Sequence, residues 1–370
     1  MNYVILAGGV GERLWPLGSP EKPKQFHAVI GDEPLVVQAV RRIAPLLTKE
    51  GSGEVSEKDR SDTPPTSSSK WGRKIYFSTI ERYVPLLKEL FPDIPDERYI
   101  VEPARRDTGP AMAYVAAKLA QTEPDEPVAF IPSDHVIKDE ERFVKTLQLA
   151  ESLIRETGKM LDIGVPAKFP STVLGYTHVG EKKEQNDISV YTFLGHTEKP
   201  DLETAEKYVE SGEYLWHANY YMWTPAKILE ALKKYAPEMH EVIMRSLEDP
   251  EEYKTIEKIS FDYAITEHMD PKDVTILGGD FGWSDVGAWD TLFDELAKSK
   301  ADNVTRGEIV ALDTEGSIIH SESGRKVGVI GLKDMVVVDT EEGLLVCPKD
   351  RAQEVKKLLQ HINTSTHQHK

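Results

Sequence analysis

The sequence has little cysteine, no excess of positive charge and no long apolar run, and each absence excludes a class of protein. Cys347 is the single cysteine among 370 residues, so an internal disulfide framework is excluded and a reducing compartment is indicated. The net charge of −18 disfavours a general nucleic-acid binder, because phosphate backbones require clustered lysine and arginine. No window approaches the ~18 uninterrupted apolar residues of a membrane span. The opening apolar run is also too short for a signal peptide. We therefore expect a cytoplasmic protein that has neither nucleic acid nor membrane as a partner.

The N-terminal stretch carries the strongest chemical signal. Tyr3 to Ala7 is apolar and rich in β-branched residues, which predicts a short buried strand. Glycines follow it directly, so the backbone there can take positive φ and approach a ligand closely. Successive amides in such a loop form a cradle for anions, and Arg13 and Lys24 could reach the same anion. The pattern predicts a phosphate site at the end of the first strand. The glycines are Gly8, Gly9 and Gly11.

Two common phosphate-binding loops do not fit this stretch. Arg13 and Leu14 stand where the dinucleotide fingerprint needs its third glycine. The Gly-Lys-Ser/Thr triplet of the Walker A loop is absent from it.

The pattern that does fit is Gly-Gly-x-Gly-x-Arg-Leu-x-Pro-Leu-x5-Pro-Lys, which runs from Gly8 to Lys24. It resembles the signature of the sugar-1-phosphate nucleotidylyltransferases. The triplet Lys24-Gln25-Phe26 is similar to the mannose-1-phosphate guanylyltransferase branch of that family. The resemblance covers nearly the whole chain except residues 49–73 and the last few.

Strand-like and helix-like segments alternate through most of the chain. This alternation predicts an α/β domain with a doubly wound, Rossmann-like and mainly parallel sheet, and we expect it to cover residues 1–299. Residues 49–73 have almost nothing to bury and read as a low-complexity insertion. In such sheets ligands bind at the carboxyl ends of strands.

The C-terminal segment has a different pattern. Short β-type runs between Asn303 and Cys347 recur at roughly ten-residue spacing, and an amphipathic helix follows at residues 351–362. We expect residues 300–370 to form a small all-β unit with a terminal helix. The resemblance implies a short left-handed β-helix that helps the family dimerise, so a homodimer is expected. We expect no phosphomannose isomerase domain to follow.

Two carboxylates are candidate metal ligands. Asp134 follows a predicted strand, and Asp285 lies in Trp-Ser-Asp-Val-Gly. Carboxylates from two loops could share Mg²⁺ with substrate phosphates, although an aspartate at a strand end is often only a helix N-cap. The family's Pro-Ser-Asp-His and Trp-Ser-Asp-Val-Gly motifs both stand here unaltered. By that resemblance Asp134 and Asp285 are the metal ligands.

The segment from Glu102 to Ala111 looks like the part of the family that lies beside the nucleobase. Asp107 replaces the family's Asn, and an acceptor there could pair with guanine. Asp107 or Thr108 could equally cap the following helix, and the two roles are compatible. The resemblance assigns nucleotide contacts to Leu6, Gly8, Gly9, Gly11, Glu102, Asp107, Thr108 and Ser133.

The sugar side is predicted from three short motifs. The resemblance assigns sugar hydroxyls to Glu198 and the sugar phosphate to Lys199. His217 departs from the pattern, because it stands where the family has an Asn near the sugar. Either Asn219 takes over this contact, or the sugar pocket is altered. The predicted sugar-phosphate residues are Gly175, Tyr176, Glu198, Lys199 and Asn219.

The resemblance implies transfer of GMP from GTP to mannose 1-phosphate, which gives GDP-mannose and pyrophosphate. Mg²⁺ is the implied cofactor, and Arg13 and Lys24 are the implied catalytic residues, since charge neutralisation and positioning dominate phosphoryl chemistry. One alternative is the same reaction with another sugar phosphate or nucleotide. A second is a catalytically silent sugar-nucleotide-binding regulator.

Overall fold

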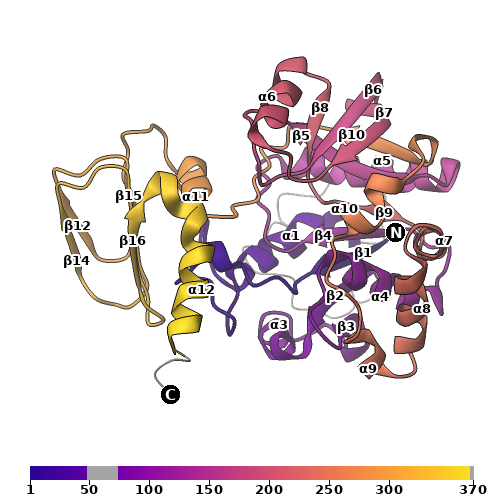
Figure 1. Cartoon of the computed structure of the whole chain (residues 1–370), viewed down its shortest axis with the longest axis horizontal. Helices are drawn as coiled ribbons and strands as arrows, with labels where there is room; N and C mark the ends of the chain where they lie inside the picture. Colours follow the sequence, from indigo (N-terminus) through magenta and orange to yellow (C-terminus); the bar gives the residue numbers. More distant parts are fainter. Residues whose placement is uncertain (48–73, 367–370) are drawn as a thin grey trace. The chain divides into compact units, whose positions relative to one another are not determined.

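A computed structural model describes residues 1–47 and 74–366 (Figure 1). The predicted insertion at 49–73 lies outside the described residues. The chain divides into two compact units, and each is built from several segments. The large unit comprises Met1–Gly8, Ala39–Ser133 and Ile137–Trp283, and the small unit comprises Gly9–Gln38, Asp134–Val136 and Ser284–Lys370. The expected boundary between residues 299 and 300 stays a prediction.

The N-terminal part of the large unit is a parallel sheet. Four strands pair in the order β4-β1-β2-β3, and every pairing among them is parallel. Side chains on both faces are buried, as expected for a parallel sheet covered by helices. The strands are β1 (Asn2–Leu6), β2 (Ile75–Ile80), β3 (Tyr99–Glu102) and β4 (Val128–Pro132).

The remaining strands extend the same sheet with mixed pairing. β6 and β7 form a long hairpin whose turn is Asn186-Asp187, both at positive φ, as tight hairpin turns require. β10 pairs parallel to β5 and antiparallel to β7. The strands are β5 (Met160–Pro166), β6 (Tyr176–Gln185), β7 (Ile188–Thr197), β8 (Tyr214–His217), β9 (Met222–Trp223) and β10 (Val274–Gly278). The α/β class is confirmed, and the antiparallel pairings of β6 to β9 are an addition to the predicted parallel part.

Helices cover the sheet of the large unit. α4 packs against α7 and α8 around a continuous apolar core that includes Phe130, Tyr253 and Phe261. Side-chain caps from Asp139, Asp201 and Thr224 begin α5, α6 and α7, and such caps satisfy free backbone amides of the first turn. The helices are α1 (Leu35–Leu47), which enters from the small unit, α3 (Val84–Leu90), α4 (Thr108–Ala120), α5 (Glu140–Thr157), α6 (Leu202–Ser211), α7 (Pro225–Tyr235), α8 (Pro237–Ser246), α9 (Pro250–Tyr253) and α10 (Phe261–Ala264).

The small unit stacks short strands in parallel, as a β-helix does. β11, β13 and β15 form one parallel ladder, β12 and β14 form another, and β16 pairs antiparallel to β15. Trp289 of α11 packs with Ile318 and Val338 in its core. This confirms the expected small all-β unit, and its handedness stays a prediction. The elements are β11 (Val304–Arg306), β12 (Ile309–Leu312), β13 (Ile318–Ser321), β14 (Val327–Ile330), β15 (Met335–Asp339), β16 (Leu344–Pro348), α11 (Trp289–Leu296) and α12 (Val355–Thr366).

None of the helices in the described part of the chain has the length and apolar character needed to cross a membrane.

Candidate active site

The glycine loop of the small unit is shaped by close packing. Gly11 has φ +69°, and a Cβ there would lie 2.7 Å from Cγ of Lys24, so only glycine fits. Arg13 follows in a 3₁₀ turn, Glu12–Leu14. Its Nη1 donates to Oε1 of Gln353 at 2.9 Å, and Gln353 in turn donates to Asp290. The Arg13 guanidinium is therefore held in place and is still about one third exposed.

Lys24 is the centre of a charge cluster in the small unit. Its side chain is 6% exposed, and its Nζ lies 2.9 Å from Oδ2 of Asp134. The same Nζ donates to the backbone oxygens of Asp285 at 2.9 Å and Val286 at 3.3 Å. One buried ammonium thus ties together the two loops that carry the predicted metal ligands.

A backbone bridge also joins these loops. Val136 and Ser284 exchange two hydrogen bonds, of 2.9 and 3.0 Å. Arg13 Nη2 lies 3.9 Å from Oδ2 of Asp285. A Cβ at Gly287 would lie 2.7 Å from Arg13 Nη2, so a larger residue there would displace the Arg13 guanidinium. The structure therefore brings Arg13, Lys24, Asp134 and Asp285 together.

Electrostatics in this cluster favour charged carboxylates. Burial opposes ionisation of Asp134, but the adjacent Lys24 ammonium outweighs it and lowers the pKa of the Asp134 carboxyl. Both carboxylates are partly exposed, 34% for Asp134 and 21% for Asp285. Two accessible carboxylates on bridged loops are a donor set that fits Mg²⁺.

In the large unit, the end of β1 is anchored by hydroxyl groups. Ser133 Oγ donates to the backbone oxygen of Leu6 at 2.7 Å, and Thr79 Oγ1 donates to that of Ala7 at 3.1 Å. A Cβ at Gly8 would lie 3.7 Å from Oε1 of Glu102. The predicted nucleotide residues Leu6, Gly8, Glu102 and Ser133 are thus gathered at the ends of β1, β3 and β4.

Glu102 is buried, and the hydroxyl groups of two neighbouring side chains donate hydrogen bonds to its carboxylate. Ser78 Oγ donates to its Oε1 at 3.1 Å, and the Tyr253 hydroxyl donates to its Oε2 at 2.9 Å. Burial outweighs these hydrogen bonds and raises the pKa of the Glu102 carboxyl to about 7. Glu102 can therefore change protonation near neutral pH.

Asp107 and Thr108 act at the start of α4. Oδ1 of Asp107 accepts from the amide of Thr108 at 2.8 Å, and Oγ1 of Thr108 accepts from the amide of Phe261 at 3.0 Å. A Cβ at Gly109 would lie 2.8 Å from the backbone oxygen of Ile259. The capping role considered for Asp107 is therefore present, and both side chains remain exposed.

Four of the predicted sugar residues, Gly175, Tyr176, Glu198 and Lys199, lie at the start of β6 and just after the end of β7. Gly175 packs tightly against Glu198, and Lys199 forms an ion pair with the same carboxylate. Tyr176 is buried, and its hydroxyl accepts from the amide of Ser171 at 2.7 Å. Burial opposes ionisation of Glu198, but contacts with His196 and Lys199 outweigh it and lower its pKa. Asn219 has φ 59° and is exposed.

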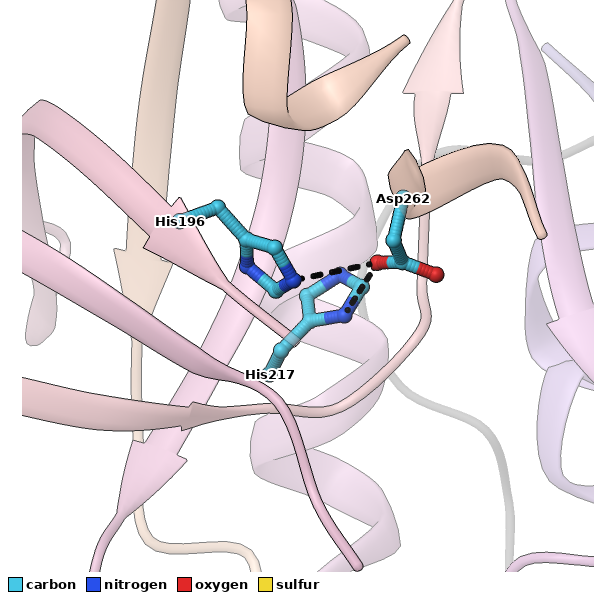
Figure 2. Close-up of side chains that lie close together, drawn as sticks. All are labelled: His196, His217 and Asp262. Carbon is cyan, nitrogen blue, oxygen red and sulfur yellow. Dashed lines mark ion pairs between the residues drawn. The ribbon is translucent and has the colours of Figure 1, made fainter. Parts of the chain in front are cut away.

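His217 lies in a buried ionic cluster that the sequence did not predict. Its Nε2 is 3.0 Å from Oδ2 of Asp162, and its Nδ1 is 3.1 Å from Oδ1 of Asp262. Burial opposes protonation, but the two carboxylates outweigh it and raise the His217 pKa well above its usual value. Figure 2 shows His196 and His217 both directed at Asp262. The replacement of the family's Asn by His217 was the one feature of the sequence that pointed to this cluster. His196, Asp162 and Asp262 carried no such signal.

Two family models match successive parts of the chain. The family model for nucleotidyl transferases matches residues 2–302. The MannoseP isomerase/GMP-like beta-helix domain matches residues 307–362.

Similar curated proteins align along nearly the whole chain. The chain is 32% identical to the alginate biosynthesis protein AlgA of Pseudomonas aeruginosa, over 98% of this chain and 72% of that protein. It is also 32% identical to the mannose-1-phosphate guanylyltransferase of Escherichia coli K12, over 99% of this chain and 74% of that protein. A crystal structure described as mannose-1-phosphate geranyltransferase from Thermus thermophilus aligns with TM-score 0.81 at 28% identity. That alignment covers 98% of this chain and 99% of the other.

Proposed function

Because the chain belongs to the nucleotidyl transferase family, we propose that it transfers GMP from GTP to mannose 1-phosphate. The products are GDP-mannose and pyrophosphate. In this reaction a phosphate oxygen of the sugar phosphate attacks the α-phosphorus of GTP in line, and pyrophosphate leaves. Phosphate is already nucleophilic, so no general base is required. Positioning and neutralisation of charge supply most of the rate.

The small-unit cluster supports the part of this reaction that concerns the triphosphate. We propose that Arg13 stabilises charge on the phosphates and that Lys24 orients both Asp134 and the phosphates. Asp134 and Asp285 would hold Mg²⁺, whose contribution when bound is to neutralise phosphate oxygens. The distances from Lys24 Nζ to Asp134 Oδ2 and to the Asp285 carbonyl oxygen, 2.9 Å each, support this assignment.

The large-unit residues support the recognition steps. We propose that Leu6, Gly8 and Ser133, together with Gly9 and Gly11 of the small unit, contact the nucleotide. We propose that Glu102, Asp107 and Thr108 face the guanine base, and that Gly175, Tyr176, Glu198, Lys199 and Asn219 serve the sugar phosphate. Lys199, which is about half exposed, is able to meet an incoming anion.

The observation that carries the proposal is the 32% identity to a mannose-1-phosphate guanylyltransferase over 99% of this chain. The test is pyrophosphate release by the purified chain from GTP, with and without mannose 1-phosphate and Mg²⁺. We expect release only when all three are present. No release with any sugar phosphate, together with tight binding of GDP-mannose, would instead support a silent regulator.

A second sugar is the competing possibility, and the His217 cluster favours it. The family's Asn at this position lies near the sugar, whereas His217 is enclosed by Asp162 and Asp262 and is 1% exposed. Competition among mannose 1-phosphate, glucose 1-phosphate and other sugar phosphates, with GTP, ATP and dTTP in parallel, separates the two possibilities. Equal use of glucose 1-phosphate would replace mannose in the proposal.

We also propose that the enzyme is a cytoplasmic homodimer. Apolar side chains are exposed on the β-helix strands, among them Val310 of β12, Ile330 of β14 and Val346 of β16, and a partner copy would cover them. Light scattering of the purified chain tests the dimer. Cell fractionation tests the location.

A further inference from the structure

Three potential metal ligands converge in the core of the large unit. His196 lies on β7, His217 ends β8, and Asp262 lies in α10. Nε2 of His196 is 3.4 Å from Oδ1 of Asp262, and Nδ1 of His217 is 3.1 Å from the same oxygen. All three ligand atoms lie within 4.8 Å of one another, and Figure 2 shows both histidine rings directed at the same oxygen of Asp262.

The ring nitrogens of these histidines are buried, and the carboxylate oxygens near them do not meet hydrogen-bond geometry. Both side chains have 0% exposure, and among the described residues no partner meets hydrogen-bond geometry at any of their four ring nitrogens. Buried polar atoms in folded proteins are nearly always satisfied, so an exception indicates a bound water or ion. Two such histidines that face one carboxylate indicate a cation.

The charges of the buried side chains also favour a bound cation in this cluster. Asp162 and Asp262 are 1% and 4% exposed, and both flank His217. A protonated His217 compensates one of these two negative charges. A divalent cation beside a neutral His217 would compensate both, and buried charges are stable only when they are compensated.

We propose that His196 Nε2, His217 Nδ1 and Asp262 Oδ1 bind a divalent transition-metal ion of the zinc class. Two imidazole nitrogens and a carboxylate oxygen suit zinc, whereas Mg²⁺ prefers oxygen ligands alone. Ligands about 2.0–2.1 Å from a tetrahedral zinc lie about 3.3 Å from each other. The observed separations of 3.1 and 3.4 Å to Asp262 therefore suit the ion with little movement.

The surrounding residues match the outer shell of a metal site. Asp162 faces the other nitrogen of His217, an arrangement that orients ligating histidines and leaves Nδ1 free for the metal. The Tyr221 hydroxyl donates to Oδ1 of Asp262 at 2.5 Å, and Thr266 donates to Tyr221 at 3.1 Å. Oε2 of Glu198 lies 3.6 Å from His196 Nε2 and adds negative charge beside the cluster. The ion would fasten β7, β8 and α10 to one another, and this does not depend on which reaction the enzyme performs.

A proton competes with the metal ion for the ring nitrogen of His217. Asp162 and Asp262 both favour protonation of His217. His196 is faced by two carboxylates, those of Glu198 and Asp262. The Tyr221 hydroxyl faces Asp262. A metal ion must therefore displace the proton from His217, so its binding releases about one proton and weakens as the pH falls.

The test uses the full chain after dialysis against a chelator, with Mg²⁺ in excess throughout. Zn²⁺ is titrated by calorimetry in two buffers of different ionisation enthalpy, which measures both binding and proton release. We expect one Zn²⁺ per chain and release of about one proton. Co²⁺ should give the intense visible absorption of a tetrahedral nitrogen and oxygen site. Absence of a Co²⁺ band and of Zn²⁺ binding in the wild-type chain would overturn the proposal.

Variants assign the ion to this cluster. His196→Gln should lower the Zn²⁺ affinity by about 100-fold while pyrophosphate release with Mg²⁺ remains measurable. The matched control is His178→Gln, since His178 lies beside Glu213 at the surface, and its Zn²⁺ affinity should be unchanged. Equal loss in both variants, or loss in neither, would place the ion elsewhere and overturn the assignment. If His196→Gln does not fold, Asp262→Asn is tested in its place. A changed Co²⁺ spectrum in that variant would assign the ion to this cluster, and an unchanged spectrum would overturn the assignment.

Discussion

The two units use different cations to balance their clustered carboxylates. In the small unit, Asp134 is paired with Lys24 and Asp285 lies beside Arg13, and both carboxylates are partly exposed. In the large unit, Asp162 and Asp262 are buried, and His217 lies between them. Lysine and arginine keep their charge at neutral pH, whereas a histidine can release its proton or exchange it for a metal.

This difference follows the family motifs. Where the resemblance is unbroken, from Gly8 to Lys24 and at Asp134 and Asp285, the cations are permanent, as the binding of a polyanion requires. Where the sequence departs, at His217, the cation is titratable and is shut away from solvent. The first cluster is suited to hold a substrate, and the second is suited to hold the core together.

The largest expected effect comes from removal of the histidine cation. His217→Asn leaves Asp162 and Asp262 buried without a counter-charge, and loss of one partner of a buried pair costs about 3–5 kcal/mol. We expect the free energy of unfolding, measured in urea, to fall by that amount. His178→Gln is the surface control, because exposed ion pairs contribute about 0–1 kcal/mol. Similar losses in both variants would show that the cluster does not stabilise the core.

Removal of the guanidinium from the small unit should affect rate and leave stability nearly unchanged. Arg13→Ala removes the proposed charge-assisted contact to the phosphates, and we expect kcat for pyrophosphate release to fall about 100-fold. The control is Arg351→Ala, which breaks an exposed pair with Glu354. Near wild-type turnover in a folded Arg13→Ala would remove Arg13 from the proposed site. So would an equal loss in the control.

The sequence predicted the small-unit cluster better than the large-unit one for a physical reason. Arg13, Lys24, Asp134 and Asp285 stand in motifs that match the family, and this resemblance implied that the two aspartates share a metal site. His196, His217 and Asp262 come from two strands and a helix, and residue periodicity does not reveal which distant segments will meet. Alternating helices and strands predicted the α/β class, but Met222–Trp223 is too short to predict as a strand.

A third kind of carboxylate sharpens the comparison, because the hydrogen bonds to buried Glu102 come from the hydroxyl groups of Ser78 and Tyr253. Its folded-state pKa of about 7 lies above the unfolded value of 4.5. The folded state therefore binds the extra proton between these values, and stability falls as pH rises from about 4.5 to about 7. Glu102→Gln should remove this loss and raise the free energy of unfolding by about 3 kcal/mol at pH 8, with little change at pH 4.

Denaturation in urea at both pH values measures this effect. Glu181→Gln is the matched control, since Glu181 is exposed and paired with Lys183. A gain of equal size at pH 4 and pH 8 would mean that Glu102 is not protonated in the folded enzyme near neutral pH.

The smallest expected effect is the pH dependence of the His217 contribution in the absence of transition metal. The folded-state pKa of His217 is raised, so its stabilisation is fully present below about pH 6.5 and is lost as pH rises toward the folded-state value. The difference in stability between the wild type and His217→Asn should therefore shrink by at most about 1.4 kcal/mol per pH unit above pH 6.5.

The Asp134 cluster should behave in the opposite sense. Its carboxyl pKa is lowered, so its contribution is present above about pH 4 and is lost only as the pH falls below that. Unfolding curves of the wild type, His217→Asn and Asp134→Asn between pH 5 and pH 9 separate the two. A wild-type advantage over His217→Asn that stays constant across this range would mean that the folded-state pKa of His217 is not raised above its unfolded value. In that case Asp162 and Asp262 would give the protonated form of His217 no net stabilisation.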